Sequence, residues 1–226
     1  MPPEAAYNRG CAARGRRRFG KGMCMPRAQN KPTSRDLQRM QTRERIVAAA
    51  VPEFKRAGLA GADVTAVARA AGVAQGTFYF HFPTKEHMAL ELERLEEQRI
   101  GKVLSKYLAG EHDLDGALRQ VVRVVLSAER HLGPQLFKDV LSLHFTKARP
   151  ADDEWTEHPV IVALVGEIER ARAAGDVDPE VDPFHSAVFF LLGLYALVAT
   201  TPGSKRARDE VLQKFVATAL RGLAAR

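Results

Sequence analysis

Residues 75 to 86, QGTFYFHFPTKE, allow two incompatible secondary structures, and the choice between them decides the fold class of the chain. Read with a period of two, the segment alternates phenylalanines with polar side chains, as a β-strand does. Read with a helical period, Phe78 and Phe82 lie four residues apart on one face. Thr77 and His81 then share another face.

The remainder of the chain favours the helix. From Ser34 onward, apolar residues recur at intervals of three and four, and no second strand candidate occurs in the sequence. A lone strand would leave its backbone groups without partners, which is costly when they are buried. We therefore predict an all-α fold, in which the segment is a short helix with one buried phenylalanine face.

Capping and turn-forming residues set the bounds of the predicted helices. The first helix ends at Gly58, and we expect a kink within it because Pro52 removes one backbone hydrogen bond. Asp63 and Thr84 are suitable N-caps for the second helix and for a long central helix. Besides the short helix after Gly72, the predicted helices cover residues 34–58, 64–71, 84 to about 106, 113–131, 134–148, 158–174, 183–200 and 204–224.

Two short helices joined by a tight glycine turn form a helix-turn-helix. The segment VARAAGVAQGTFYFHFPTKE resembles the DNA-binding signature of the TetR family of transcriptional repressors, and the close match covers about residues 42 to 92. The residues that carry the resemblance are Ala71, Gly72, Val73, Gly76, Thr77, Phe78, Tyr79, His81, Phe82, Lys85 and Glu86.

The resemblance implies a division of the chain into three parts. Residues 1–33 form a basic N-terminal extension, and residues 34–83 form a three-helix DNA-binding domain that contains the helix-turn-helix. Residues 84–226 form a larger helical domain for effector binding and dimerisation.

The side chains of the short helix suit contact with DNA. Gln75 can form two hydrogen bonds with adenine, the Thr77 methyl can contact thymine, and Gly76 exposes backbone near the groove. Tyr79 and His81 can donate to phosphates, as the resemblance also implies. The alternative for these two is an ordinary intramolecular hydrogen bond, and DNA contact is favoured because both lie opposite the phenylalanine face.

Further candidate phosphate contacts flank the short helix. Lys85 occupies the first turn of the central helix, where the helix dipole disfavours a cation by ~0.3–1 kcal/mol. A bound phosphate would reverse this penalty, whereas the alternative is a solvated lysine. In relatives, the position of Thr65 bonds a phosphate, and Arg43 and Arg45 are candidate backbone contacts.

The C-terminal half is predicted to bind a second subunit and a ligand. The segment 183–200 is apolar nearly all round, which suggests core on one face and a second subunit on the other. In relatives, the last two helices, here 183–200 and 204–224, form a four-helix homodimer interface. The candidate pocket residues indicate an apolar or aromatic effector, and no charged anchor stands out among them. For each residue, the alternative is packing in the core. The candidates are Tyr107, Phe137, Leu141, His144, Phe145, Trp155, Phe190 and Tyr195.

Charge is concentrated at the N-terminus. Residues 1–35 hold nine of the 34 lysines and arginines but only Glu4 of the 27 acidic residues, a net charge of +8 within a total of +7. The remainder is therefore close to neutral, at −1. The basic segment is interpreted as a solvated tail, with a phosphate-binding arm or a targeting peptide as alternatives.

Other features exclude several classes of protein. The two cysteines, Cys11 and Cys24, lie in the basic segment, so no disulfide framework is expected and a cytoplasmic location is favoured. The longest apolar run, residues 187–199, is shorter than the ~20 residues that span a bilayer, so no membrane partner is expected. No motif typical of an enzyme and no clustered metal ligands occur, so neither catalysis nor a cofactor is expected.

The sequence thus favours a homodimeric repressor that binds a palindromic double-stranded DNA operator and is released from it by a small-molecule effector. One alternative is a sequence-tolerant DNA-binding protein whose affinity comes from the basic arm. An enzyme or carrier built on a helical bundle is the weakest alternative.

Overall fold

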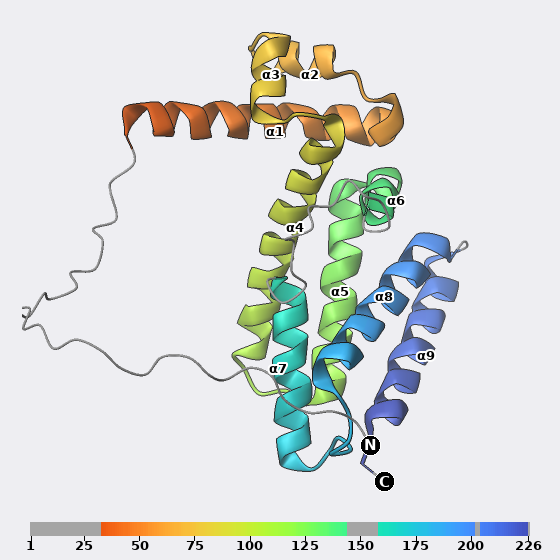
Figure 1. Cartoon of the computed structure of the whole chain (residues 1–226). Coiled ribbons are helices and arrows are strands. Elements are labelled where there is room, and N and C mark those ends of the chain that lie inside the picture. The colour runs from red at the N-terminus through yellow and green to blue at the C-terminus, as the bar shows by residue number, and fades with distance from the viewer. Residues whose placement is uncertain (1–32, 144–157, 202–203, 226) are drawn as a thin grey trace, which may run out of the picture.

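The computed structural model describes residues 33–143, 158–201 and 204–225, and every regular element in these ranges is an α-helix (Figure 1). The predicted all-α fold is thereby confirmed. The helices are α1 (Ser34–Gly61), α2 (Val64–Ala70), α3 (Gln75–His81), α4 (Lys85–Leu108), α5 (Leu114–Leu132), α6 (Pro134–Leu143), α7 (Pro159–Ala174), α8 (Pro183–Thr200) and α9 (Lys205–Leu223).

The helices form a small cluster and a larger bundle. Helices α1, α2 and α3 lie together at one end of the molecule, and α4 leaves this cluster to run alongside α5 and α7 (Figure 1). Helices α8 and α9 lie side by side, and both pack against α5. The short helix α6 contacts α1, α4, α5 and α8, so it touches both the cluster and the bundle.

The segment of residues 75–86 folds as the helix α3 and the start of α4, and contains no strand. Within α3, Phe78 is fully buried, and Phe82 is buried directly after the helix ends. Their ring centroids lie 5.9 Å apart, and both belong to the core that α1 contributes through residues such as Ile46 and Phe54. The predicted phenylalanine face is therefore confirmed, and it fixes α3 against α1.

Helix α1 loses its helical geometry at Gly58, where the prediction ended the first helix, but it lacks the expected break at Pro52. Pro52 lies within the helix, and the non-helical dihedrals occur instead at Gly58, with φ of 68° and ψ of 174°. Glycine adopts positive φ at little cost, so the chain turns there and continues to Gly61. The expected kink at Pro52 is therefore wrong, and the direction changes six residues later.

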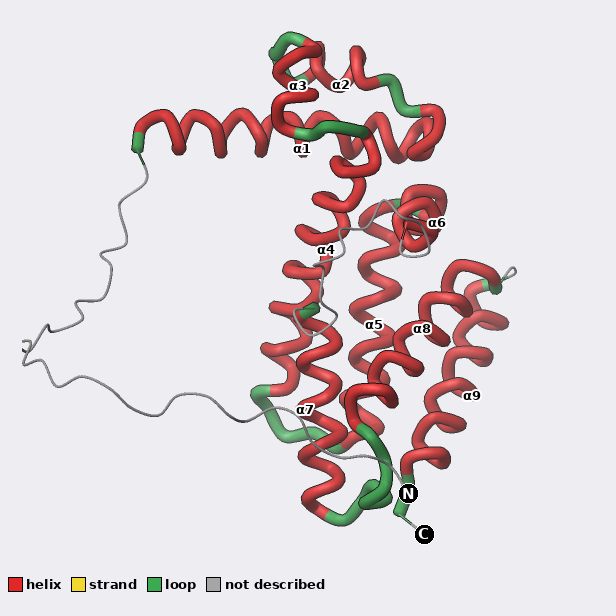
Figure 2. Tube along the Cα trace, viewed as in Figure 1, coloured by secondary structure: helices red, strands yellow, loops and turns green. Residues whose placement is uncertain are grey.

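The other predicted boundaries agree with the structure to within two residues. Thr84 caps α4 by accepting a hydrogen bond from the His87 amide, and Asp63 caps α2 by accepting one from Thr65. Short loops join most of the helices (Figure 2). The predicted helix 134–148 is confirmed up to Leu143, and its last five residues lie outside the described ranges.

Helix α8 is the most apolar element. By length and hydropathy alone, it is the one described helix that could cross a membrane. It packs against α7 and α9, with Ala187 and Leu194 fully buried. Phe189, however, is 67% exposed, so one face of α8 has no covering element within the described chain.

Candidate nucleic-acid interface and effector cavity

The turn between α2 and α3 is closed by local hydrogen bonds. The amide of Gly72 donates to the carbonyl of Arg69 at 3.1 Å, and that of Val73 donates to Ala68 at 3.0 Å. Gly72 has φ of +66°, a conformation that residues with side chains rarely adopt. The sequence therefore sets the angle between α2 and α3 locally, as the predicted helix-turn-helix requires.

The predicted DNA-contacting residues of the motif lie on its open surface. Gln75, Gly76 and Tyr79 are exposed on α3, Thr77 is half-buried, and Thr65 is exposed in the first turn of α2. A Cβ atom at Gly76 would meet nothing within 4 Å, so a DNA backbone or base edge could approach closely there. The structure thus brings these residues together, and their contact with DNA stays a prediction.

His81 ends α3 beside two arginines. Burial and the positive charges of Arg39 and Arg43 lower the pKa of its imidazole below the ordinary value. The ring is half-buried, and its neighbours favour the neutral form at neutral pH. A phosphate placed beside His81 would oppose these effects.

Arg43 has a structural role that the sequence did not indicate. Its Nη1 donates to the carbonyl of His81 at 3.1 Å, and its Nη2 lies 3.1 Å from Oε2 of Glu91 on α4. Its guanidinium carbon lies 4.2 Å from the ring centroid of Phe82, a cation–π geometry. Arg43 therefore ties α1 to both α3 and α4, whereas Arg45 is exposed on α1.

Lys85 is also held by the protein. Its Nζ donates to the carbonyl oxygen of Ala60 at 2.5 Å, which joins the first turn of α4 to the end of α1. The side chain is half-buried, so the alternative of a freely solvated lysine does not apply. A phosphate at this position would bind an ammonium group that is already fixed in place.

Phe80 is a surface feature that sequence reasoning missed. It is 67% exposed on α3, and the guanidinium carbon of Arg39 lies 5.3 Å from its ring centroid. The sequence could have predicted this exposure, because a residue two positions from both Phe78 and Phe82 in a helix cannot lie on their buried face. Phe80 adds a large apolar group to the surface that carries Tyr79.

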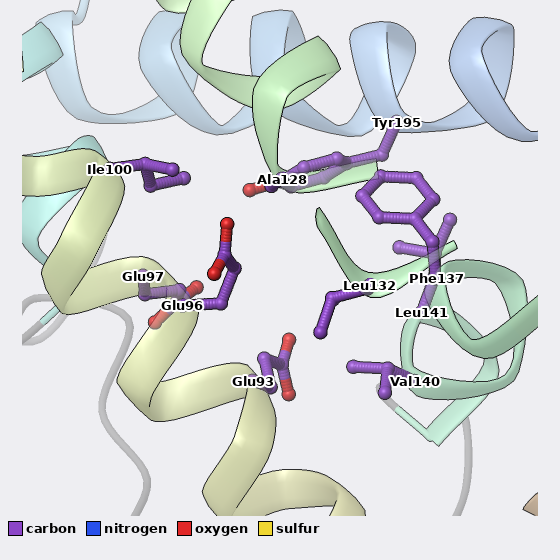
Figure 3. A pocket seen from close by; sticks show the side chains of 10 residues that line it. All are labelled: Glu93, Glu96, Glu97, Ile100, Ala128, Leu132, Phe137, Val140, Leu141 and Tyr195. Atoms are coloured by element: carbon purple, nitrogen blue, oxygen red, sulfur yellow. The ribbon is translucent and has the colours of Figure 1, made fainter. Parts of the chain in front are cut away.

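A small cavity of about 40 Å³ lies in the bundle between α4, α5, α6 and α8 (Figure 3). A second cavity, of about 20 Å³, shares Glu97, Leu141 and Tyr195 with the first and extends towards α7. The described residues that line the first cavity are Glu93, Glu96, Glu97, Ile100, Ala128, Leu132, Phe137, Val140, Leu141 and Tyr195.

The predicted pocket residues divide into three groups. Phe137, Leu141 and Tyr195 line the cavity, whereas His144, Phe145 and Trp155 lie outside the described residues. Phe190 is buried, but it stacks on Phe215 of α9 at 5.0 Å. Tyr107 lies at the far end of α4, with its ring 5.7 Å from that of His112. Neither Phe190 nor Tyr107 lines these two cavities, and a role for either in ligand binding stays a prediction.

The expectation of a cavity without charged groups is also wrong. Glu93, Glu96 and Glu97 project from α4 into it, on the same helical face as Ile100. Their spacing of three and four residues is visible in the sequence, but glutamates on a helix usually face solvent. Only the packing of α5, α6 and α8 against that face encloses them.

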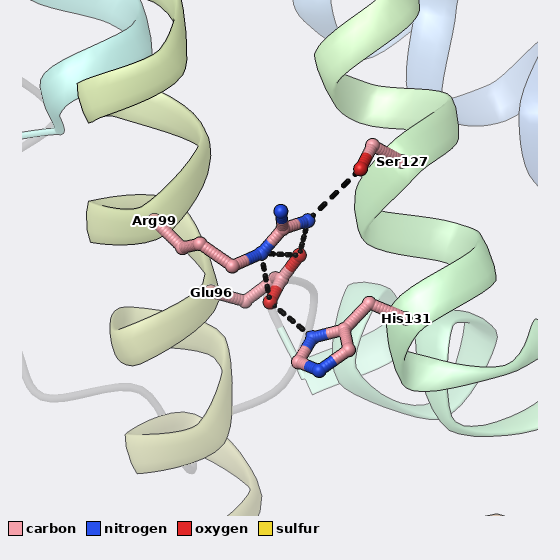
Figure 4. Close-up of polar contacts among 4 residues, drawn as sticks. All are labelled: Glu96, Arg99, Ser127 and His131. Atoms are coloured by element: carbon pink, nitrogen blue, oxygen red, sulfur yellow. Dashed lines mark hydrogen bonds and ion pairs between the residues drawn. The ribbon is translucent and has the colours of Figure 1, made fainter.

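Glu96 is held in a network that joins α4 to α5 (Figure 4). The residue is 5% exposed, and Nε of Arg99 donates to its carboxylate at 3.0 Å. Nδ1 of His131 lies 2.6 Å from Oε2 of Glu96, and Arg99 also donates to Oγ of Ser127 at 3.1 Å. The hydrogen bond to Glu96 raises the pKa of Arg99. The negative charge of Glu96 is therefore compensated by Arg99 of the same helix, and Ser127 and His131 join this pair to α5.

The remaining polar groups of the cavity come from three helices. Oε2 of Glu97 lies 2.7 Å from Nδ1 of His158, the residue that precedes α7. Tyr195 extends from α8 with its hydroxyl directed towards the glutamates (Figure 3). Burial raises the pKa of Tyr195, and the negative charges of Glu97 and Glu93 raise it further.

Comparison with known proteins relates the chain to bacterial transcription regulators. A family model described as "Bacterial regulatory proteins, tetR family" matches residues 46–92. The regulator AcrR of Shigella flexneri is 33% identical over 69 residues, which are 30% of this chain and only 32% of that protein. The regulator UidR of Escherichia coli (strain K12) is 22% identical over 169 residues, or 74% of this chain and 85% of that protein.

Solved structures share the fold. A TetR family transcription regulator from Marinobacter aquaeolei VT8 has a TM-score of 0.59 at 18% identity, covering 84% of this chain and 99% of that one. The ketosteroid transcriptional regulator KstR2 of Mycobacterium tuberculosis has a TM-score of 0.54 at 20% identity, covering 81% and 95%.

Proposed function

This chain carries the DNA-binding domain of the TetR family and is a DNA-binding transcription regulator, and we propose that it acts as a homodimeric repressor released from a palindromic operator by a small-molecule effector. The observation that carries the proposal is the position of α4. This helix begins directly after the exposed recognition helix α3 and forms one wall of the cavity. In this proposal, residues 34–83 bind DNA and residues 84–226 bind the effector and the second subunit.

The proposed DNA contacts come from the helix-turn-helix and from the start of α4. The exposure of Gln75, Gly76 and Tyr79 supports base and backbone contact by α3 in the major groove. Thr77, His81, Lys85 and Thr65 are assigned to thymine or phosphate contacts. The regulator acts in the cytoplasm, where bacterial operators are accessible.

The exposed apolar face of α8 supports the homodimer. Phe189 is 67% exposed on a helix that is otherwise apolar, and α9 lies beside it. Burying such a face against the same face of a second subunit forms a two-fold interface. A two-fold dimer can present two α3 helices to major grooves about 34–36 Å apart.

Effector control follows from contacts that cross between the bundle and the cluster. Helix α6 lines the cavity through Phe137, Val140 and Leu141, and its Asp139 accepts a hydrogen bond from the Leu59 amide at 2.7 Å. A ligand that binds one arrangement of α4 and α6 better than another shifts the spacing of the two α3 helices. Operator affinity then falls when the ligand binds.

The test is selection of random double-stranded DNA by the purified protein at near-physiological salt, followed by sequencing. Enrichment of a two-fold palindrome is the expected result. Binding without an enriched site would instead favour the sequence-tolerant alternative, and deletion of residues 1–33 would then abolish binding. A matched variant, Gln75→Ala, should relax the preference at one base position in each half-site.

A further inference from the structure

We propose that Phe80 and Arg39 form one composite contact with DNA, in which the ring of Phe80 packs on the methyl group of a thymine in the major groove and the guanidinium of Arg39 binds a backbone phosphate beside it. The inference deepens the proposed function and rests on it, because α3 must enter the groove for the ring to reach a base. It assigns a base to one position of α3 and a role to an arginine of α1.

Phe80 lies in the middle of the exposed face of α3. Gly76 and Phe80 are four residues apart and therefore share one side of the helix, away from the fully buried Phe78. Side chains on a helix lean towards its N-terminus, so Phe80 leans towards the turn that contains Gly76. A Cβ atom at Gly76 would meet nothing within 4 Å, which leaves this turn open. A base edge can therefore approach the ring of Phe80.

The ring of Phe80 restricts which base it can recognise. Phenylalanine has no donor or acceptor, so it cannot pair with the polar groups that adenine, guanine and cytosine present in the major groove. The thymine methyl is the apolar group of that groove, and phenylalanine is one of the side chains that contact it. Phe80 is 67% exposed, so a methyl group placed against its ring would remove apolar surface from water.

Arg39 lies over the same ring with its donors available. Its guanidinium carbon is 5.3 Å from the ring centroid of Phe80, within the ~6 Å range of cation–π contacts. Within the described chain, the guanidinium has no hydrogen bond or ion pair. The acidic residue one turn earlier, Asp36, accepts instead from Oγ1 of Thr33 at 2.7 Å. The five N–H donors of Arg39 therefore remain for a phosphate.

The charges around the pair favour duplex DNA as the partner. Arg39 and Arg43 lie one turn apart on α1, and their charges, after the larger effect of burial, lower the pKa of His81 at the end of α3. This positive surface attracts a polyanion. A duplex carries one phosphate per ~1.7 Å of its axis, so a phosphate lies beside any base that the ring contacts. Duplex DNA therefore offers a partner to both halves of the contact at once.

The stacking of Arg39 on Phe80 couples the two halves. A guanidinium held over a ring loses less conformational freedom when it binds a phosphate than a freely moving one. Removal of the ring should therefore weaken the phosphate contact as well as the base contact. The two substitutions should then be non-additive, as expected for residues that touch each other.

The thymine contact is tested with DNA that the protein has selected from the random pool. Replacement of single thymines by uracil removes only the methyl group, and at one position in each half-site it should weaken binding about fourfold. In Phe80→Ala the effect at that position should disappear, whereas Phe80→Leu should keep part of it. Leu95→Ala, at an exposed apolar position on α4, should respond as the parent does. A set of uracil effects that is unchanged in Phe80→Ala would overturn the proposal.

The phosphate contact is tested on the same DNA by the dependence of affinity on salt. Arg39→Ala should reduce the slope of log affinity against log salt by about 0.9 for each half-site. Arg123→Ala, at an exposed position on α5, is the matched control and should leave the slope unchanged. In Phe80→Leu, further substitution of Arg39 should lower the affinity less than it does in the parent. An unchanged slope in Arg39→Ala would also overturn the composite contact.

The outcomes separate this inference from the proposed function. If no palindrome is selected, both fail together. If a palindrome is selected but binds the Phe80 and Arg39 variants like the parent, only the inference fails, and the exposed ring is then left for a protein partner. Thermal unfolding of each variant shows whether it is folded, and both side chains are exposed, so we expect melting temperatures close to that of the parent.

Discussion

At the scale of single residues, two of the proposed DNA-contacting residues are already held in place by other parts of the protein. Lys85 is fixed by the carbonyl of Ala60, and the backbone of His81 is fixed by Arg43. Ordering such groups before binding lowers the entropy that DNA binding would otherwise cost. The same contacts mean that a substitution can affect both folding and DNA binding, so each test needs a measurement that distinguishes the two.

Operator affinity should rise as the pH falls from about 7.5 to about 6, because DNA binding would protonate His81. Burial, Arg39 and Arg43 lower the pKa of the free histidine, and a phosphate would raise it, so the complex binds more protons than the free protein. In His81→Gln, operator affinity should depend less on pH across this range. An equal slope in the variant would contradict the phosphate contact.

The same lowered pKa makes the folded protein less stable as the pH falls, whereas operator affinity rises. Because the unfolded chain binds a proton to His81 more readily than the folded chain, this residue removes stability as the pH falls through about 6.5. Thermal unfolding of the parent and of His81→Gln at both ends of the pH range separates this effect from DNA binding.

Lys85→Ala should weaken binding to all DNA sequences alike and reduce the slope of log affinity against log salt by about 0.9, the loss of one phosphate contact. Lys102→Ala, an exposed lysine further along α4, is the control and should leave the slope unchanged. If Lys85→Ala lowers only the melting temperature, then Lys85 stabilises the contact between α4 and α1 and does not bind DNA.

At the scale of elements, the end of α1 is shaped by its contact with α6. Oδ1 of Asp139 accepts from Gln135 at 2.8 Å, while Oδ2 accepts from the Leu59 amide at 2.7 Å. A Cβ atom at Gly58 would lie 3.1 Å from that Oδ2 and 3.3 Å from Cγ of Gln135. Positive φ and close approach therefore both favour glycine at this junction between cluster and bundle.

Gly58→Ala should destabilise the protein by about 1–2 kcal/mol, because an L-residue with positive φ is strained and the new methyl group crowds Asp139. Gly166→Ala is the control, since this glycine lies within α7 with nothing within 4 Å of its Cβ position. Chemical denaturation should show the control unchanged or more stable. Equal stability of both variants would contradict the conclusion that this junction requires glycine at position 58.

Pro52→Ala should stabilise the protein by about 1–3 kcal/mol, because Pro52 lies inside a helix whose dihedrals stay helical there. Alanine restores an amide that can donate to the carbonyl of Ala48. Pro183→Ala provides the comparison, since proline at the start of α8 interrupts no helical hydrogen bond. A loss of stability in Pro52→Ala would show that the proline is needed where it is.

At the scale of the whole molecule, the bundle leaves an apolar surface that a second copy can cover. Helix α9 packs on α8 closely enough that a Cβ atom at Gly193 would lie 2.9 Å from Cε2 of Phe215. This contact fixes the two helices as one unit, with Phe189 on its outside.

Phe189→Asp should convert the proposed dimer to a monomer and abolish cooperative binding to a palindrome, because the charge would be buried without a partner. Val162→Asp, on the exposed face of α7, is the control at a similarly exposed apolar position. Sedimentation and operator titration measure both properties. A Phe189→Asp variant that stays dimeric would place the interface elsewhere.

The sequence by itself determined the helices, the turn at Gly72, the buried face of Phe78 and Phe82, and the family of the DNA-binding domain. These features depend on residues that are neighbours along the chain, so capping, periodicity and glycine conformation specify them locally. Only the tertiary structure decided that α4 carries glutamates into a cavity, that Arg43 and Lys85 join α1 to later helices, and that Asp139 meets Leu59. Each of these contacts links residues on different helices, and no local pattern encodes which helical faces will meet.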